Sequence, residues 1–171
     1  MNTMICNNAG AAVSPAAAAR TVALGGSDFR PRTLDQAVQD AVDAQPAEAL
    51  TPLNADSARP FTQARDVLAL LVRGYAEQIY SSAKLASRAA SDPDFPWPWW
   101  EALPDASALS RFRAANRAPL LESLKAALQF QVEERIYAGA VTRVNRPRLA
   151  EEAHRRITMA AFADSQELEA E

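Results

Sequence analysis

The residue types that usually perform catalysis are scarce in this chain. It contains one histidine, His154, and one cysteine, Cys6. A Ser or Cys nucleophile needs a neighbouring base, and a Cys/His metal site needs several ligands, so neither kind of site is expected. No Gly-x-Gly-x-x-Gly or Gly-x-x-x-x-Gly-Lys segment is found that would form a phosphate-binding loop. We therefore expect a protein that is not an enzyme, needs no metal or cofactor and has no small-molecule substrate.

Two short segments combine hydroxyl and cationic side chains in a way that suits DNA. Residues 82–90 and 107–117 are each predicted to form a helix that opens with serine and carries Lys or Arg opposite its apolar face. Hydroxyls at a helix start bind phosphate oxygens, and guanidinium groups in the next turns bind guanine edges or phosphates. We expect the 107–117 helix to enter the major groove and Lys84, Arg88 and Arg113 to contact phosphates. The candidate DNA contacts are Ser81, Ser82, Lys84, Arg88, Ser107, Ser110, Arg111, Arg113 and Arg117.

Charge is distributed unevenly along the chain. The net charge is −3, yet residues 111–156 hold ten Lys/Arg against five Glu. Residues 157–171 hold four acidic side chains and no basic one. The basic stretch fits a polyanionic partner, but the solvated surface of an ordinary helical protein has a similar composition. Charge by itself therefore leaves both interpretations open.

Composition and the spacing of apolar residues predict an all-α fold. Alanine accounts for 38 residues and glycine for only 5, and no stretch alternates apolar and polar residues as a half-buried strand would. Thr33 and Gln36 have the spacing of a capping box, and Gly139 is a typical helix terminator. The expected helices span residues 34–42, 62–79, 82–90, 107–117, 120–137 and 147–161.

The chain is predicted to have three parts. Residues 1–60 form an Ala-rich disordered tail and a proline-containing linker with one short helix. Residues 61–163 form a compact multi-helix domain, and residues 164–171 form an acidic tail that frays. The three tryptophans fall between prolines within residues 97–100, where they are expected to cover the small core.

Membrane and export features are not recognised in the sequence. No segment is long and apolar enough to cross a bilayer, and the first residues do not have the pattern of a secretory signal. A single cysteine cannot form an intramolecular disulfide, which fits a reducing compartment. We expect a soluble cytoplasmic protein that has no membrane partner.

Four sequence blocks occur in the order and approximate spacing of a known family. They are VLALLVRGY at 67–75, YSSAKLA at 80–86, DPDF at 92–95 and PDASALSRFRAANR at 104–117. The set resembles the N-terminal domain of bacterial insertion-sequence DDE transposases. In that family a helix ending in Gly-Tyr precedes a Ser-Ser-Arg-Lys-Leu-like helix, an acidic-Pro-x-Phe segment and a Pro-Asp-His-Ser-Thr-Leu-Ser-Arg-Phe-Arg-like helix. The similarity covers about residues 61–130.

This resemblance implies a helical domain with a helix-turn-helix-like pair that helps hold transposon-end DNA. Leu109 and Phe112 match apolar anchors of the family, which implies a role in the core. The polar positions that match the family are Ser81, Ser82, Lys84, Ser107, Ser110, Arg111, Arg113 and Arg117.

Several positions depart from the family pattern. Ala83, Ala106 and Ala108 stand where the family often has Arg, His and Thr, and each change removes a polar contact to DNA. The family continues into a ribonuclease-H-like domain whose first strand carries a catalytic Asp, whereas this chain has no acid between Gly139 and Glu151. A two-metal carboxylate site is therefore not expected, and neither is cutting or joining of DNA.

We interpret the sequence as that of a non-catalytic DNA-binding protein related to transposase N-terminal domains, either a regulator or a remnant of a transposition system. Its expected partners are duplex DNA and a full-length transposase or a second copy of itself. The alternative is a helical protein-interaction or self-association module that does not bind DNA. In a DNA-binding protein these four side chains should be exposed to solvent and unpaired with acidic residues: Ser107, Ser110, Arg111 and Arg117. In an interaction module they should be buried or paired with acidic residues.

Overall fold

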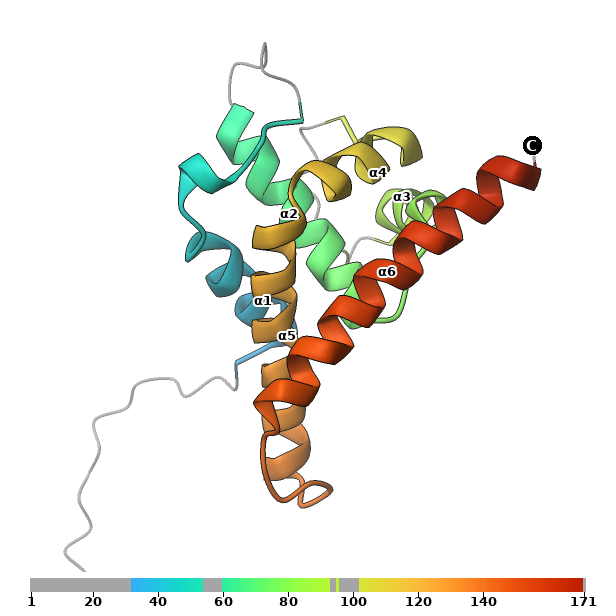
Figure 1. The fold of residues 1–171 in the computed structure, drawn as a ribbon. Helices are drawn as coiled ribbons and strands as arrows, with labels where there is room; N and C mark the ends of the chain where they lie inside the picture. The colour runs from blue at the N-terminus through green and yellow to red at the C-terminus, as the bar shows by residue number, and fades with distance from the viewer. Residues whose placement is uncertain (1–31, 54–59, 93–94, 96–101, 171) are drawn as a thin grey trace, which may run out of the picture. The chain divides into compact units, whose positions relative to one another are not determined.

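The structure, a computed structural model, describes residues 32–53, 60–92, 95 and 102–170. These ranges contain helices and no β-strand, which confirms the predicted all-α fold (Figure 1). None of the helices within them is long and apolar enough to span a membrane. The elements are α1 (Leu34–Asp43), the 3-10 helix η1 (Ala47–Ala49), α2 (Pro60–Ala76), α3 (Ser82–Ser91), α4 (Ala106–Ala115), α5 (Arg117–Tyr137) and α6 (Arg146–Ala170).

Helix α1 begins with the predicted capping box. The Thr33 hydroxyl accepts a hydrogen bond from the Gln36 N–H at 3.3 Å, and the Gln36 side chain accepts one from the Thr33 N–H at 3.0 Å. The buried face of α1 packs against α2 and α5, and an ion pair joins its Asp35 to Arg73. The predicted domain start at residue 61 lies too late, because the apolar residues of α1 are already part of the core.

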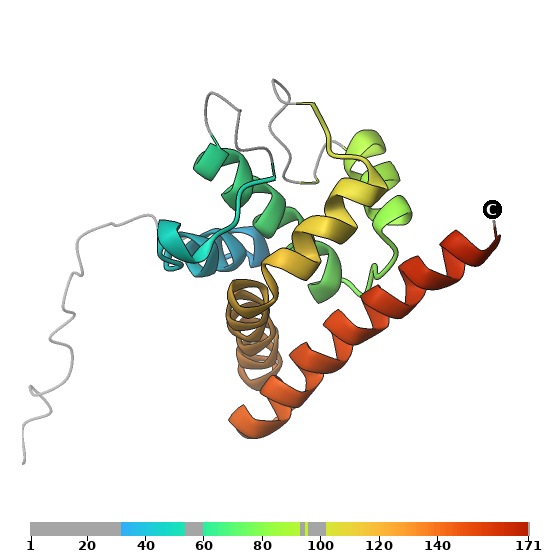
Figure 2. The ribbon, with the colours of Figure 1, turned by 45° about the horizontal axis from the view of Figure 1, so that its top comes forward.

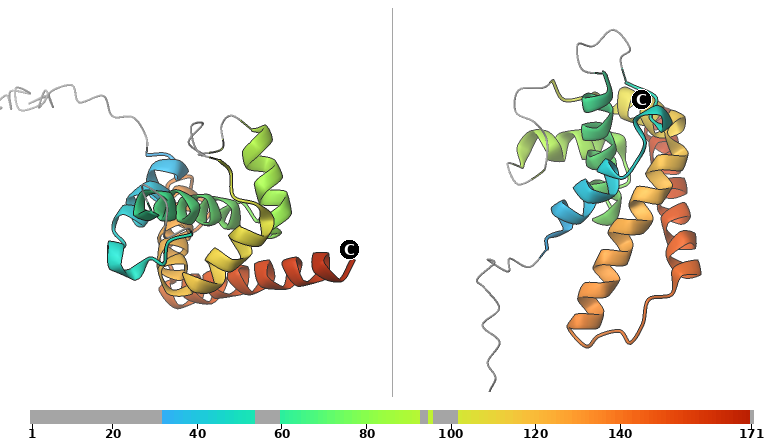
Figure 3. Two further views of the ribbon diagram at one scale, coloured as in Figure 1. Left: turned by 90° about the horizontal axis from the view of Figure 1, so that it is seen from above. Right: turned by 90° about the vertical axis from the view of Figure 1, so that its left-hand side faces the viewer.

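Helix α2 is the centre of the described fold. All the other α-helices pack against it, and Figure 3 shows it surrounded by elements from both ends of the chain. Its middle turns, from Val67 to Val72, are buried on every side. A helix that is covered on all faces needs apolar residues in every turn, and this stretch consists of Val, Leu and Ala alone.

One buried asparagine fastens the segment between α1 and α2 to the domain. Asn116, at the junction of α4 and α5, accepts a hydrogen bond from the Thr51 N–H at 2.7 Å and donates one to the Thr51 carbonyl at 3.0 Å. It also donates to the Phe112 carbonyl at 3.1 Å, and Leu50 is buried in the core. Residues 50–51 are therefore part of the packed domain rather than of a free linker.

Gly139 ends α5 as the sequence predicts. Its φ is 74°, and its N–H donates to the Ile136 carbonyl at 2.9 Å. The following N–H, of Ala140, donates to the Arg135 carbonyl at 2.8 Å. These two bonds form a Schellman motif, which favours glycine because residues with a side chain adopt the left-handed backbone only with strain.

Helix α6 continues well beyond its predicted end. It runs to Ala170, so the expected fraying tail at 164–171 is wrong for the residues that the structure describes. The physical reason is that Asp164, only 8% exposed, accepts hydrogen bonds from α3 and α4. A helix held by such an anchor in its last turns gains tertiary contacts that an isolated helix end lacks.

The other sequence expectations have mixed outcomes. The remaining predicted helices are confirmed, with their ends displaced by a few residues. Leu109 and Phe112 are buried in the core, as the resemblance implied. The tryptophan cluster at 97–100 and the predicted disorder of residues 1–31 fall outside the described residues.

Gly74 allows α2 and α3 to approach closely. A Cβ at this position would lie 2.4 Å from Cδ1 of Leu85, which is fully buried. Alanine is a better helix former than glycine, so helix propensity does not explain the residue. The glycine is explained by the space that the Leu85 side chain occupies.

Gly74→Ala should lower the free energy of unfolding by about 1–3 kcal/mol, because the added methyl group overpacks against Leu85. In a Leu85→Ala background the same change should be stabilising by up to about 1 kcal/mol, because the space is then free and Ala favours the helix. Urea unfolding of the wild type, both single variants and the double variant measures this coupling. Equal costs in the two backgrounds would show that close approach is not the reason for Gly74.

Candidate nucleic-acid interface

The two serine-opened helices lie side by side. Helix α3 packs against α4, and α6 passes the start of α3 (Figure 2). A pocket of about 350 Å³ lies where these three helices meet. It brings together part of both predicted polar blocks. The predicted residues that line it are Ser82, Ser107, Ser110 and Arg111.

The start of α4 presents its first serine beside a capping carboxylate. Asp105 accepts hydrogen bonds from the Ala108 N–H at 2.7 Å and from the Ser107 hydroxyl at 3.0 Å. These bonds lower the pKa of Asp105, so its carboxylate is ionised near neutral pH. Ser107 is exposed, and Ser110, one turn later, is half-buried.

Arg111 on α4 and Arg117 at the start of α5 are exposed cations. Neither forms an ion pair in the part of the chain that the structure describes, although Arg111 interacts electrostatically with Asp105. The Nη2 atom of Arg117 lies 3.4 Å from Nε2 of His154. Glu122, on the same helix as Arg117, pairs with Lys125 instead. Two guanidinium groups are thus available to phosphates or base edges.

The predicted phosphate contacts of α3 are also at the surface. Lys84 is exposed. Arg88 pairs with Asp92 at 2.7 Å, and its side chain is about half exposed. A surface ion pair of this kind contributes little energy, so it does not prevent Arg88 from binding a phosphate.

Ser81 and Ser82 face the interior instead of solvent. The Ser81 hydroxyl accepts a hydrogen bond from the Lys84 N–H at 3.1 Å, which caps α3, and donates to Glu167 at 2.6 Å. The N–H and the hydroxyl of Ser82 both donate to the Asp164 carboxylate, at 2.7 and 2.6 Å. Since acids of α6 occupy both hydroxyls, the predicted DNA contacts by these serines do not hold in this structure.

Arg113 is likewise turned inward, with 6% of its surface exposed. Its Nη1 pairs with Asp164 at 2.7 Å and donates to the Tyr75 hydroxyl at 3.3 Å, while its Nη2 donates to the Ser110 hydroxyl at 3.0 Å. The predicted phosphate contact by Arg113 does not hold in this arrangement either, because the guanidinium is buried and already has a counter-charge. Its position to the side of the polar face directs it toward α6.

Hydrogen bonding keeps Asp164 charged although it is buried. Burial raises the pKa of Asp164, but donation by Ser82 and Arg113 lowers it by more, and the net shift is downward from 3.8. Tyr75 shows the opposite balance, since burial raises its pKa to about 12 and leaves a neutral hydroxyl beside Arg113. The network therefore contains one anion, one cation and neutral hydroxyl groups.

Arg156 makes a second connection between α6 and the turn from α2 to α3. Its Nη1 donates to the carbonyl oxygens of Tyr75 and Ala76 at 2.8 and 3.0 Å, and its Nε donates to Glu152 at 2.7 Å. Bonds from Arg155 and Arg156 lower the pKa of Glu152 to about 2. Helix α6 thus supplies a donor to the last carbonyls of α2 and an acceptor to the first N–H of α3.

Asp164 and Glu167 are the residues of this region that sequence reasoning missed. It placed them in a fraying tail because the end of the chain is acidic. A usable pattern was present, since Ala153, Ile157 and Ala160 form the buried stripe of α6 and Asp164 continues it at helical spacing. A carboxylate on such a stripe needs buried donors, which points to partners elsewhere in the fold.

Residues 27–115 match the transposase domain family DUF772, and the chain belongs to this family. The match includes α1 to α4 and therefore both serine-opened helices, whereas α5 and α6 lie beyond it. No curated protein and no solved structure matches the chain. The expected relation to transposases is confirmed at the level of this family, and the more specific relation to the N-terminal domain of DDE transposases stays a prediction.

Removal of the Asp164 carboxylate should destabilise the domain strongly. Asp164→Ala leaves Arg113 buried without a counter-charge and the Ser82 N–H without its acceptor, so we expect a loss of about 3–5 kcal/mol in the free energy of unfolding. Glu167→Ala removes a single bond to Ser81 and should cost about 1 kcal/mol. Urea unfolding followed by circular dichroism measures both changes. Similar losses in the two variants would contradict the central role of Asp164.

Acid should weaken the attachment of α6. The folded-state pKa values of Asp164 and Glu152 lie below their ordinary values of 3.8 and 4.5. Both groups therefore stabilise the fold when the pH is above those ordinary values. This stabilisation is lost as the pH falls, down to about pH 2 for Glu152. The midpoint of thermal unfolding should therefore begin to fall below about pH 4.5.

The Asp164→Asn variant provides the control for this pH dependence. It should be less stable than the wild type at neutral pH, and the difference should shrink as the pH falls below 3.8 and Asp164 of the wild type takes up a proton. Thermal unfolding of the two proteins across this pH range measures the difference. A constant gap between the two curves would show that the charge of Asp164 is not responsible.

Proposed function

We propose that this chain binds duplex DNA through α4, the start of α5 and the outer side of α3. The observation that carries the proposal is the pair Arg111 and Arg117, two exposed guanidinium groups that form no ion pair among the described residues. Arg117 directly follows Asn116, which the core holds in place, and Arg111 lies five residues before Asn116 on α4. Membership of a transposase domain family supports DNA as the polyanion.

The proposed contacts divide into two kinds. Arg111 and Arg117 reach into the major groove, where guanidinium groups can bind guanine edges as well as phosphates. Lys84, Arg88 and the Ser107 hydroxyl bind the phosphates beside the groove and set the orientation of the helices. The buried network around Asp164 holds α3 in position relative to α4. Its members Ser82 and Arg113 face the interior and not the proposed DNA surface.

In this role the chain holds DNA and does not cut it. The carboxylates closest to the proposed surface are engaged already, because Asp105 caps α4, Asp164 pairs with Arg113 and Glu167 accepts a hydrogen bond from a serine. Such a protein regulates or assists transposition by occupying DNA or by joining a full-length transposase. Its relation to the DDE transposase N-terminal domain belongs to the same proposal.

A second candidate function is the docking of a protein partner, including a second copy of this chain. Met159 and Phe162 lie about one turn apart on α6 and are 40% and 59% exposed. Large apolar side chains that face solvent on one side of a helix are typical of an interaction surface. Neither residue belongs to the proposed DNA surface, so the two functions are compatible.

Fluorescence anisotropy with a labelled random-sequence duplex tests the DNA proposal. Arg111→Ala/Arg117→Ala should weaken binding by about tenfold or more, and it should reduce the slope of log K against log salt by about 2, because two phosphate or base contacts are lost. The matched control, Arg32→Ala/Lys125→Ala, removes the same charge from two exposed ion pairs elsewhere and should bind as the wild type does.

Two results would reject binding through this surface. One is the lack of measurable binding at about 50 mM salt, where phosphate contacts are strongest. The other is an equal loss in the test and control variants, which would indicate general electrostatic attraction. In either case partner docking would become the preferred function.

A further inference from the structure

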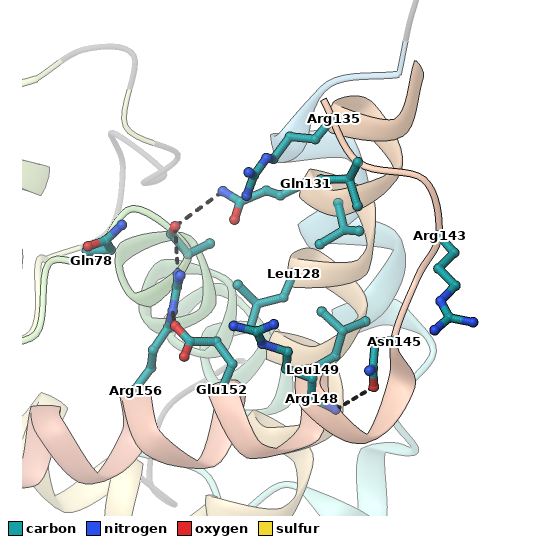
Figure 4. Close-up of a pocket in the computed structure, with 13 residues that line it drawn as sticks. Gln78, Leu128, Gln131, Arg135, Arg143, Asn145, Arg148, Leu149, Glu152 and Arg156 are labelled. Atoms are coloured by element: carbon teal, nitrogen blue, oxygen red, sulfur yellow. Dashed lines mark hydrogen bonds and ion pairs between the residues drawn. The ribbon is translucent and has the colours of Figure 1, made fainter. Parts of the chain in front are cut away.

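A second concave surface is formed by different elements from the proposed DNA surface. A pocket of about 580 Å³ lies between the C-terminal half of α5, the loop that follows it, the first turns of α6 and the end of α2 (Figure 4). Leu128, Val132 and Leu149 give it an apolar lining. Its volume is within the range of pockets that bind small organic ligands.

Two arginines extend into this pocket without a carboxylate partner in the described ranges of the chain. Figure 4 shows Arg135 extending from α5 and Arg148 from α6 toward the same space. Both are exposed, and Arg143 adds a positive charge on the connecting loop. Glu152 also lines the pocket, but Arg156 already binds it. The pocket therefore has an excess of positive charge.

The start of α6 increases this positive potential. A helix N-terminus is stabilised by acidic side chains, yet the first turn of α6 contains Arg146 and Arg148 and no acid. The helix dipole and the guanidinium groups lie at the same end of α6, where the Asn145 side chain accepts a hydrogen bond from the Arg148 N–H at 3.1 Å. A bound anion would be attracted by both.

Gln78 places an amide group on the opposite wall of the pocket. It has a φ of 66°, and its N–H donates to the Tyr75 carbonyl while the Ile79 N–H donates to the Gly74 carbonyl. This is the Schellman position at which glycine is the favoured residue. A glutamine at a position where glycine would be less strained indicates that its side chain has a use, and that side chain lines the pocket.

We propose that this pocket binds a nucleotide. The phosphate pairs with Arg135 and Arg148, because guanidinium groups match phosphate oxygens in a bidentate manner. The base packs on the apolar lining around Leu128, and its edge faces the Gln78 amide, which can donate and accept hydrogen bonds. Free nucleotides and the unpaired end of a DNA strand share this chemistry. The site uses no residue of the α3–α4 surface, so it stands apart from the proposed function.

Titration of the full chain with N-methylanthraniloyl-AMP, followed by fluorescence, tests this site. We expect saturable binding that unlabelled AMP displaces and that Arg135→Ala/Arg148→Ala weakens by about tenfold or more, since charge-assisted hydrogen bonds are lost. The matched control, Arg111→Ala/Arg117→Ala, removes the same charge from the proposed DNA surface and should bind the probe as the wild type does.

Gln78→Gly separates a binding role from a structural one. The variant should raise the midpoint of thermal unfolding, because glycine is preferred at this backbone position, and should nevertheless weaken nucleotide binding. A purely structural role would change the midpoint of unfolding and leave the affinity unaltered. That outcome would overturn the assignment of Gln78 to the site.

Competitors identify the source of the nucleotide. Displacement of the probe by AMP but not by a 5′-phosphorylated single-stranded oligonucleotide assigns the site to free nucleotides, and displacement by both assigns it to a strand end. The proposal is overturned if no saturable binding occurs, if the Arg111→Ala/Arg117→Ala control loses as much affinity, or if inorganic phosphate competes as well as AMP. These results leave the duplex-binding measurement on α4 unaffected, so the two proposals can fail separately.

Discussion

The buried carboxylate of Asp164 is the interaction on which the arrangement of the helices depends. It accepts hydrogen bonds from the N–H and the hydroxyl of Ser82 at the start of α3 and pairs with Arg113 of α4. A buried ion pair does not by itself add stability, because removal of both charges from water is costly. Its effect is specific: only one placement of α6 gives all three donors an acceptor. The position of α3 relative to α4 follows from that placement.

This network explains why the two polar blocks of the sequence serve different purposes. On α4, the residues opposite the core form an open surface with Arg111 and the adjoining Arg117. On α3, the serines cap the helix and attach it to α6. DNA recognition by a helix requires a rigid presentation of its side chains, and the buried polar bonds provide that rigidity. The same residue types therefore act at the surface in one helix and inside the fold in the other.

The fold also resolves the conflict between an acidic chain and a proposed anionic partner. Several acids are used internally, since Asp164 and Glu167 bind α3 and α4 while Glu152 is held by two arginines of its own helix. Arginines such as Arg111 and Arg148 stay exposed and form no ion pair among the described residues. Net charge consequently says less about partners than the location of the paired and unpaired groups does. The two proposed sites lie where the unpaired cations gather.

Local pattern determined the helices, because capping and periodic apolar spacing act within a few residues. Thr33 and Gln36 start α1, Gly139 ends α5, and the spacing of Leu109 and Phe112 identifies the buried side of α4. The openness of Arg111 also followed from that spacing. Only the tertiary structure decided the orientation of Ser82 and Arg113, since their partner Asp164 lies 82 and 51 residues away in the sequence. A polar side chain that faces away from the apolar side of its own helix can still be buried and hydrogen-bonded by a helix that is distant in the sequence. The local sequence pattern does not contain that information.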